Sequence, residues 1–251
     1  MIIAITNQKG GIGKSSTAQA VGAYYANKGK KVLLIDLDAQ QNLTMACGIQ
    51  GARVSSYDIF KEPEHVTDGV LQVRENLFII PASDNLSDVQ EVLPKAGREF
   101  RLKEALSGLA RFDYIVLDTP PALSDLTVNA LTAADVVIIP AQADFFSLEA
   151  IKELVGTIQV VQRYTNSKLR VDGILLTRYQ KRSRLTQDYT AGIEQLAAAI
   201  GTRVYKTRIR ESVSIKEAQA VRTDIFSYDP KSNGAKDYFE FCEEMNINEQ
   251  R

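Results

Sequence analysis

Runs of consecutive apolar residues recur along the chain, and each run is short enough to be a single strand. The runs are continuous rather than alternating, which is typical of strands that are covered on both faces, as in a parallel sheet. They predict strands over residues 2–5, 32–36, 77–81, 114–118, 135–140, 171–177 and 203–205.

Between these runs the apolar residues follow a helical period. The clearest case is 147–164, where Ile151, Leu154, Val155 and Ile158 lie on one stripe. Strand and helix alternate throughout, which predicts an α/β fold with a doubly wound, mostly parallel sheet flanked by helices. No linker or repeat divides the chain, so we expect one domain over residues 1–251. The remaining helices are expected over 17–27, 84–93, 99–109, 123–131, 185–200 and 234–245.

The amino-acid composition excludes only a few classes of protein. The chain has 30 Lys and Arg against 31 Asp and Glu, so a nucleic-acid surface would have to be a local patch. Cys47 and Cys242 lie far apart, without the spacing of a zinc site or a disulfide framework. There is no apolar run of about 18 residues, and a core strand starts at residue 2, so we expect neither a transmembrane helix nor a signal peptide, and a cytoplasmic location.

Candidate chemistry begins in the glycine-rich segment 7–16, between the first strand and the first helix. Glycines there let backbone N–H groups face a phosphate, and the helix N-terminus adds its dipole. Lys14 would reach the β- and γ-phosphates, and the Ser15 hydroxyl would bind Mg²⁺. The first glycine of the usual P-loop pattern is replaced by Gln8. A second lysine, Lys9, lies five residues before Lys14. The residues expected to hold the nucleotide phosphates are Lys9, Gly10, Gly11, Ile12, Gly13, Lys14, Ser15 and Ser16.

Three aspartates lie where two of the predicted strands end. Asp36 ends the strand 32–36, Asp38 follows it, and Asp118 ends the strand 114–118. A strand-end acid beside a P-loop can hold Mg²⁺, and an acid after the second strand can orient or deprotonate an attacking water. Alternatively, such an aspartate can simply cap the next helix.

Several segments together resemble the ParA/MinD superfamily, and most closely its ParA-type partition ATPases. The loop from Lys9 to Ser15 resembles the deviant Walker A motif of that superfamily. Where the family usually has proline and glycine in its second motif, this chain has Ala39 and Gln41. The chain resembles the small form of the family, without an N-terminal helix-turn-helix domain. The matching segments are 9–15, 34–42, 118–131, 140–149 and 228–235.

The resemblance implies roles for the candidate residues. Lys9 would reach the ATP of a partner subunit, so that ATP joins a homodimer. Asp38 would be the catalytic residue that activates water, together with Lys14 and Lys9. Mg²⁺ would be held by Ser15, with Asp118 as the Walker B acid and Asp36 supporting the metal shell. The adenine contacts that the resemblance implies are Thr177, Arg208 and Ile209.

Basic residues gather in the second half of the chain. Such a cluster can contact DNA phosphates without sequence preference. The alternative is a solvated face that is balanced by acids such as Glu211 and Glu217. The candidates for DNA contact are Lys181, Arg182, Arg184, Lys206, Arg210, Lys216 and Arg222.

The resulting hypothesis is an ATPase that dimerises on ATP, binds double-stranded DNA on the nucleoid and drives plasmid or chromosome partition. A ParB-type centromere-binding protein would stimulate hydrolysis and release the dimer. A membrane-cycling regulator of the MinD type would need a basic amphipathic C-terminal helix, whereas 238–245 is acidic on its polar side. A metabolic P-loop ligase of the dethiobiotin synthetase type stays open as a second alternative, although such enzymes lack the Lys9 signature.

Overall fold

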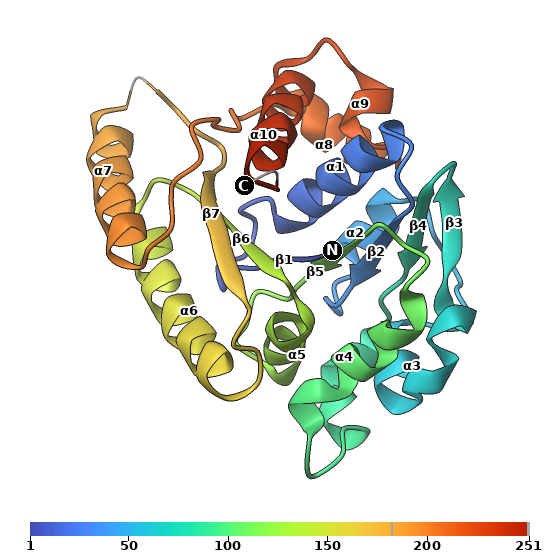
Figure 1. The fold of residues 1–251 in the computed structure, drawn as a ribbon. Coiled ribbons are helices and arrows are strands. Elements are labelled where there is room, and N and C mark those ends of the chain that lie inside the picture. Colours follow the sequence, from blue (N-terminus) through green and yellow to red (C-terminus); the bar gives the residue numbers. More distant parts are fainter. Residues whose placement is uncertain (182, 250–251) are drawn as a thin grey trace.

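The computed structural model describes residues 1–181 and 183–249, which form a sheet covered by helices on both faces (Figure 1). Seven strands pair in the order β3-β4-β2-β5-β1-β6-β7. All neighbours are parallel except β3 and β4, which are antiparallel. The strands are β1 (Ile2–Ile5), β2 (Val32–Asp36), β3 (Leu71–Arg74), β4 (Leu77–Ile80), β5 (Tyr114–Asp118), β6 (Val136–Ala141) and β7 (Arg170–Leu176).

The helices form a layer on each face of this sheet. In Figure 1, α1 and α10 cover one face, while α4, α5 and α6 cover the other. The helices are α1 (Lys14–Asn27), α2 (Asn42–Ala46), α3 (Ser56–Lys61), α4 (Arg101–Leu106), α5 (Asp125–Ala133), α6 (Phe145–Tyr164), α7 (Arg184–Ala199), α8 (Val213–Ala220), α9 (Ile225–Tyr228) and α10 (Asn233–Glu249). Short 3₁₀ helices are η1 (Pro63–Gly69), η2 (Asp84–Glu91), η3 (Arg98–Phe100) and η4 (Ser107–Leu109).

Successive strand residues point to opposite faces, so each strand contributes to two hydrophobic cores. On β2, Leu34 packs into the core beneath α1 and α10, whereas Leu33 and Ile35 pack into the core beneath α3, α4 and α5. A third core lies between the β6–β7 side of the sheet and α6 and α7. Because both faces are buried, these strands need apolar residues at consecutive positions, which explains the continuous runs in the sequence.

The predicted fold class is confirmed, but one predicted strand is wrong and one strand was missed. Residues 203–205 form no strand, and only an isolated bridge joins Val204 to Ile174. The backbone N–H groups of the next two residues, Lys206 and Thr207, donate to the Glu244 carboxylate at 2.8 and 2.9 Å instead of continuing a ladder. Strand β3 was not predicted, because its apolar residues alternate with polar ones and form no continuous run.

Helix predictions succeeded where the helices are long. The segment predicted as a helix over 84–93 is 3₁₀ at 84–91, with non-helical backbone at Asp88, and 99–109 divides into η3, α4 and η4. The short helices α2, α3, α8 and α9 were not predicted. The assignment of residues 1–251 to one domain stays a prediction, although a single sheet carries strands from residue 2 to residue 176.

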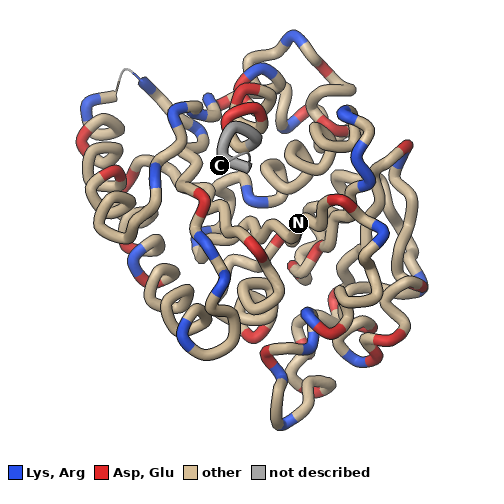
Figure 2. Tube along the Cα trace, in the orientation of Figure 1, with Lys and Arg blue, Asp and Glu red and all other residues tan. Residues whose placement is uncertain are grey.

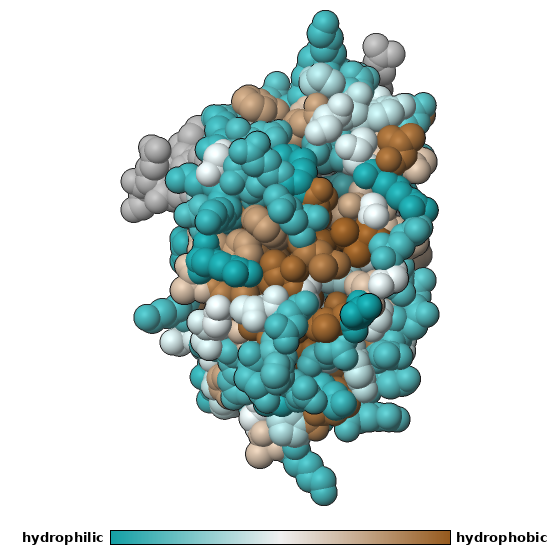
Figure 3. All heavy atoms as spheres, turned by 90° about the vertical axis from the view of Figure 1, so that its right-hand side faces the viewer, coloured by the Kyte–Doolittle hydropathy of each residue, from teal (hydrophilic) through white to brown (hydrophobic). Residues whose placement is uncertain are grey.

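The surface on the β3 side is mostly hydrophilic, with apolar side chains gathered near its middle (Figure 3). The edge strand β3 contributes Leu71 and Val73, which are partly buried against the core. Among the described helices, none has both the length and the apolar character that crossing a membrane requires.

Candidate functional site

The glycine-rich loop lies between the carboxyl end of β1 and the first turn of α1. Gly11 and Gly13 have φ of +70° and +89°, the left-handed region that favours glycine. Gly13 immediately precedes the first residue of α1. The far side of the loop is fixed by Thr177, whose hydroxyl donates to the Ile12 carbonyl at 2.7 Å. The backbone N–H groups at this helix start therefore form the kind of cradle that binds phosphate.

Lys14 is buried in this loop beside two carboxylates. Its Nζ donates to the Lys9 carbonyl at 3.1 Å. Burial lowers the pKa of Lys14, while Asp118 and Asp38 act in the opposite direction. A cation in this position, close to the glycine turn, is suited to a phosphate.

The carboxylate of Asp118 is completely buried, yet it has no hydrogen-bond partner among the described residues. Neither of its carboxylate oxygens is bonded to any described residue. Burial raises its pKa well above the usual range and Asp36 adds to this effect, whereas the nearby Ser15 hydroxyl and Lys14 lower it. The Ser15 hydroxyl thus influences the carboxylate without meeting the geometry of a hydrogen bond. An unpaired carboxylate next to a hydroxyl and a phosphate cradle is a chemically suitable site for Mg²⁺.

The protein supplies only part of a metal shell. Among the described residues, no group of three or more His, Cys, Asp and Glu side chains could hold a metal ion. Magnesium usually takes one or two carboxylates from the protein and its remaining ligands from water and phosphate. The residues therefore fit a Mg²⁺ that arrives together with a nucleotide.

Asp36 and Asp38 occupy different environments at the end of β2. Asp36 pairs in register with Asp118 and accepts from the Thr44 backbone N–H at 2.9 Å and from the Thr44 hydroxyl at 2.7 Å. It therefore holds the start of α2, and burial raises its pKa to about 6. Asp38 lines the open cavity at the loop, and its Oδ1 accepts from the Gln40 N–H at 3.0 Å. A metal role for Asp36 and a water-activating role for Asp38 stay predictions.

A cavity of about 660 Å³ opens over the loop, and a smaller one continues beside it. The smaller cavity is lined by two of the predicted adenine contacts, Thr177 and Ile209. Arg208 does not line either of the two cavities; its guanidinium lies 3.2 Å from Glu194. Sequence reasoning missed Gln219 and Tyr238, which line the smaller cavity from α8 and α10. No sequence motif marks these two residues, because they lie on helices far along the chain from the nucleotide-binding motifs.

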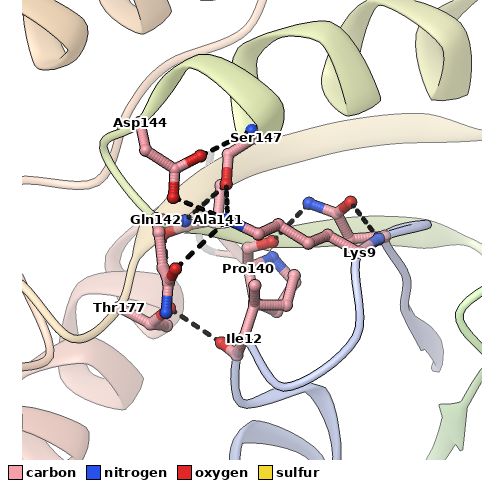
Figure 4. Close-up of polar contacts among 9 residues, drawn as sticks. Lys9, Ile12, Pro140, Ala141, Gln142, Asp144, Ser147 and Thr177 are labelled. Carbon is pink, nitrogen blue, oxygen red and sulfur yellow. Dashed lines mark hydrogen bonds and ion pairs between the residues drawn. The ribbon is translucent and has the colours of Figure 1, made fainter.

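Lys9 does not line either of these two cavities. Its side chain extends to the turn between β6 and α6, where Nζ lies 2.6 Å from Asp144 Oδ2 and 3.2 Å from Gln142 Oε1 (Figure 4). The hydroxyl of Ser147, in the first turn of α6, lies 3.4 Å away. The second lysine of the loop is thus directed away from the phosphate cradle of its own chain.

The residues predicted to contact DNA differ in how they are paired. Asp237 accepts from the Arg210 guanidinium through both oxygens, and Lys216 lies 3.5 Å from Glu211. With the Gln50 amide oriented so that its oxygen faces Arg222, that oxygen accepts from both Nη atoms at 2.6 and 2.8 Å. Within the described residues, four exposed side chains of this set have no ion pair: Lys181, Arg184, Lys206 and Arg222, whose partner is the neutral Gln50 amide. Arg182 lies outside the described residues.

Comparison with known proteins agrees with this geometry. Residues 1–171 match a family described as an AAA domain. The chain is similar to the sporulation initiation inhibitor protein Soj of Bacillus subtilis, with 41% identity over 252 residues that cover 98% of both chains. It is also similar to the chromosome-partitioning ATPase Soj of Thermus thermophilus, with 38% identity over 243 residues, or 97% of this chain and 94% of that one.

A solved structure with similar architecture contains a nucleotide. It is the cobyrinic acid a,c-diamide synthase of Mycobacterium smegmatis with a bound ATP analogue and magnesium. The TM-score is 0.84 at 29% identity, and the match covers 99% of this chain and 95% of that one.

Proposed function

Because this chain belongs to the ParA/Soj family of chromosome-partitioning ATPases, we propose that ATP joins two copies of it into a dimer that binds DNA and moves a DNA cargo. The chain is an ATPase that uses ATP and Mg²⁺. Hydrolysis returns the dimer to monomers, and a ParB-type centromere-binding protein stimulates that step. The dimer acts on the nucleoid, in the cytoplasm.

The observation that carries the proposal is the position of Lys9. One lysine of the loop, Lys14, lies inside the phosphate cradle, whereas Lys9 leaves it. Phosphoryl transfer needs positive charge on the phosphates and a positioned water. Lys9 lies outside the phosphate cradle of its own protomer, so it can supply positive charge to the phosphates bound by a second copy. The triphosphate then links the two subunits.

Within one protomer, the described side chains support the remaining roles of the proposal. Lys14 and the loop N–H groups bind the phosphates, while Ser15 and Asp118 hold Mg²⁺. Asp38, at the mouth of the open cavity, orients the attacking water. Mg²⁺ neutralises charge on the phosphates when it is bound.

Membrane cycling of the MinD type has less support than DNA binding. Among the described side chains of α10, Lys236 is the only basic one, whereas Asp237, Glu240, Glu243 and Glu244 are acidic. An anionic lipid surface repels such a helix.

The proposal is tested by measuring how much of the protein is retained on DNA with ATP, with ADP and without nucleotide, across a salt series. We expect the wild type to be retained with ATP alone. Lys9→Ala should abolish both ATP-dependent dimerisation and retention, while Asp38→Ala should leave a stable ATP-bound dimer on DNA. Equal retention on DNA with ATP, with ADP and without nucleotide would refute the ATP-dependent switch. Rapid ATP hydrolysis by Asp38→Ala would refute the role of Asp38.

A further inference from the structure

The amine of Lys9 is held by a turn that belongs to its own chain. Asp144, Gln142 and Ser147 all contribute an oxygen, and the shortest contact is the 2.6 Å ion pair with Asp144 (Figure 4). Asp144 follows Lys9 by 135 positions, so the contact depends on the tertiary fold. Both side chains are about one-third exposed or less, which leaves the ion pair open to competition.

The turn that receives Lys9 is itself well fixed. Asp144 is the N-cap of α6, and its Oδ1 accepts from the Ser147 N–H at 2.8 Å. The hydroxyl of Ser147, a buried residue, accepts from the Gln142 N–H at 3.3 Å. One carboxylate oxygen of Asp144 therefore holds the helix while the other holds the lysine, so the carboxylate cannot follow Lys9 when it moves.

The backbone of Lys9 is held as well. Its N–H donates to Asn7 Oδ1 at 3.1 Å, and the Asn7 amide donates to the Pro140 carbonyl at 2.7 Å. Its carbonyl accepts from Lys14 Nζ. Once Lys14 turns to a bound phosphate, the Lys9 carbonyl loses this donor, and the Asp144 ion pair is the remaining charged contact on Lys9.

We propose that Asp144 is a positioning residue that retains Lys9 on its own protomer and thereby sets how readily two ATP-bound copies associate. The inference rests on the proposed function, in which Lys9 acts on the nucleotide of the partner. Each association must break two such ion pairs, one for each protomer. The pair thus opposes the association of ATP-bound copies.

The first test is Asp144→Asn with a non-hydrolysable ATP analogue, followed by analytical ultracentrifugation. Asparagine is as good an N-cap as aspartate, so α6 keeps its start while the charge is lost. We expect the dimer dissociation constant to fall about tenfold, equivalent to about 1.4 kcal/mol shared by two partly exposed pairs. Glu149→Gln is the matched control: it removes a negative charge from the same end of α6, where Lys152 is the ion-pair partner of Glu149 among the described residues.

The second test follows Lys9 itself in the nucleotide-free protein. An amine-reactive ester should acylate Lys9 several times faster in Asp144→Asn than in the wild type, as measured by mass spectrometry of the N-terminal peptide. Asp144→Glu keeps the carboxylate and should restore slow acylation. A residue that only capped α6 would leave the acylation rate unchanged.

The outcomes separate this inference from the proposed function. A wild type that stays monomeric with the analogue would refute the ATP-joined dimer. A wild type that dimerises while Asp144→Asn has an unchanged or higher dissociation constant would overturn the inference alone. Unchanged acylation of Lys9 in a folded Asp144→Asn would overturn it as well.

Discussion

At the scale of the residue, the buried carboxylate of Asp118 links stability to pH. Its pKa in the folded protein is raised, whereas an ordinary aspartate titrates near 3.8. Below that value both folded and unfolded states are protonated. As pH rises above it, the unfolded state loses its proton first, so the folded state becomes progressively less stable until Asp118 itself ionises.

Asp118→Asn should therefore stabilise the nucleotide-free protein, and more so at high pH. An amide cannot ionise, so the gain in the free energy of unfolding over wild type should grow between pH 5 and pH 8, reaching about 1–3 kcal/mol. Urea denaturation at several pH values measures this difference. Asp36, whose pKa is raised to about 6, also makes the folded state less stable as pH rises. Because the wild type and Asp118→Asn both contain Asp36, its effect is common to the two proteins.

The same variant should lose stabilisation by ATP and Mg²⁺. Wild-type protein should gain thermal stability from the two together, whereas Asp118→Asn should gain much less, because it lacks the charged ligand. Glu149→Gln, an exposed substitution, should behave as wild type in both assays. An equal stability difference at pH 5 and pH 8 would contradict the assignment of the pKa shift to Asp118.

Residues within one motif were predictable, and contacts between motifs were not. The loop 7–16, Asp38 and Asp118 were proposed as site residues because each strand–loop unit carries its own local pattern. The partner of Lys9 was not found, since Asp144 is brought to it by the pairing of β1 with β6. Gln219 reaches the Ser16 hydroxyl at 2.8 Å for a similar reason: only packing brings α8 to the loop.

At the scale of the element, the loop after β2 contains a residue that departs from the family pattern and destabilises the folded backbone. Gln41, where the family usually has glycine, has φ of +56° and is the N-cap of α2. A side chain in this region costs about 1–2 kcal/mol. Its exposed amide donates to Asp84 at 2.6 Å, which offsets only part of that cost. The family that this chain resembles frequently has a glycine–lysine pair where this chain has Arg222 and Thr223, and Arg222 has φ of +58°.

Gln41→Gly should therefore raise the free energy of unfolding by about 0.5 kcal/mol, once the greater freedom of glycine in the unfolded chain is subtracted. The measurement is urea denaturation without nucleotide. Gln40→Gly is the matched control, because Gln40 has no positive φ and should lose about 0.5–1 kcal/mol. If both variants were destabilised equally, backbone strain at Gln41 would be excluded.

Elements were predictable in proportion to their length and burial. The 20 residues of α6 show several turns of an apolar stripe, and the doubly covered strands show continuous runs. Strand β3 alternates apolar and polar residues and so shows no continuous run, and the four residues of α9 are too few to show a helical period. Residues 203–205 have the composition of a strand, but Glu244 takes the backbone N–H groups that would have extended it.

At the scale of the whole molecule, the balance of charge restricts where DNA can bind. The chain has a net charge of −1, and basic and acidic residues are interspersed along the fold (Figure 2). Two of the candidate basic residues in the second half, Arg210 and Lys216, are already paired with acids. Among the described candidates for DNA contact, exposed positive charge without an ion pair is found at the start of α7, where Lys181 and Arg184 lie, at Lys206, and at Arg222, which is bonded to the neutral Gln50 amide.

Binding to DNA should therefore depend on the start of α7 more than on Arg210. A dimer of Lys181→Gln/Arg184→Gln lacks four positive charges, so the slope of log K against log salt should become shallower by roughly three to four. Retention on DNA with a non-hydrolysable ATP analogue, across a salt series and with unrelated DNA sequences, measures this slope. The loss should be uniform across sequences, because phosphate contacts carry no sequence information.

Arg210→Gln is the informative comparison, because it also removes a positive charge from each protomer. Its guanidinium is already bonded to Asp237, so the slope should change by less than about one for each protomer. Since Asp237 is buried, its carboxylate then loses a charged partner, and the free energy of unfolding should fall by about 1–3 kcal/mol. A large change of slope in Arg210→Gln, with none in the α7 variant, would move the DNA surface from α7 to the segment before α8.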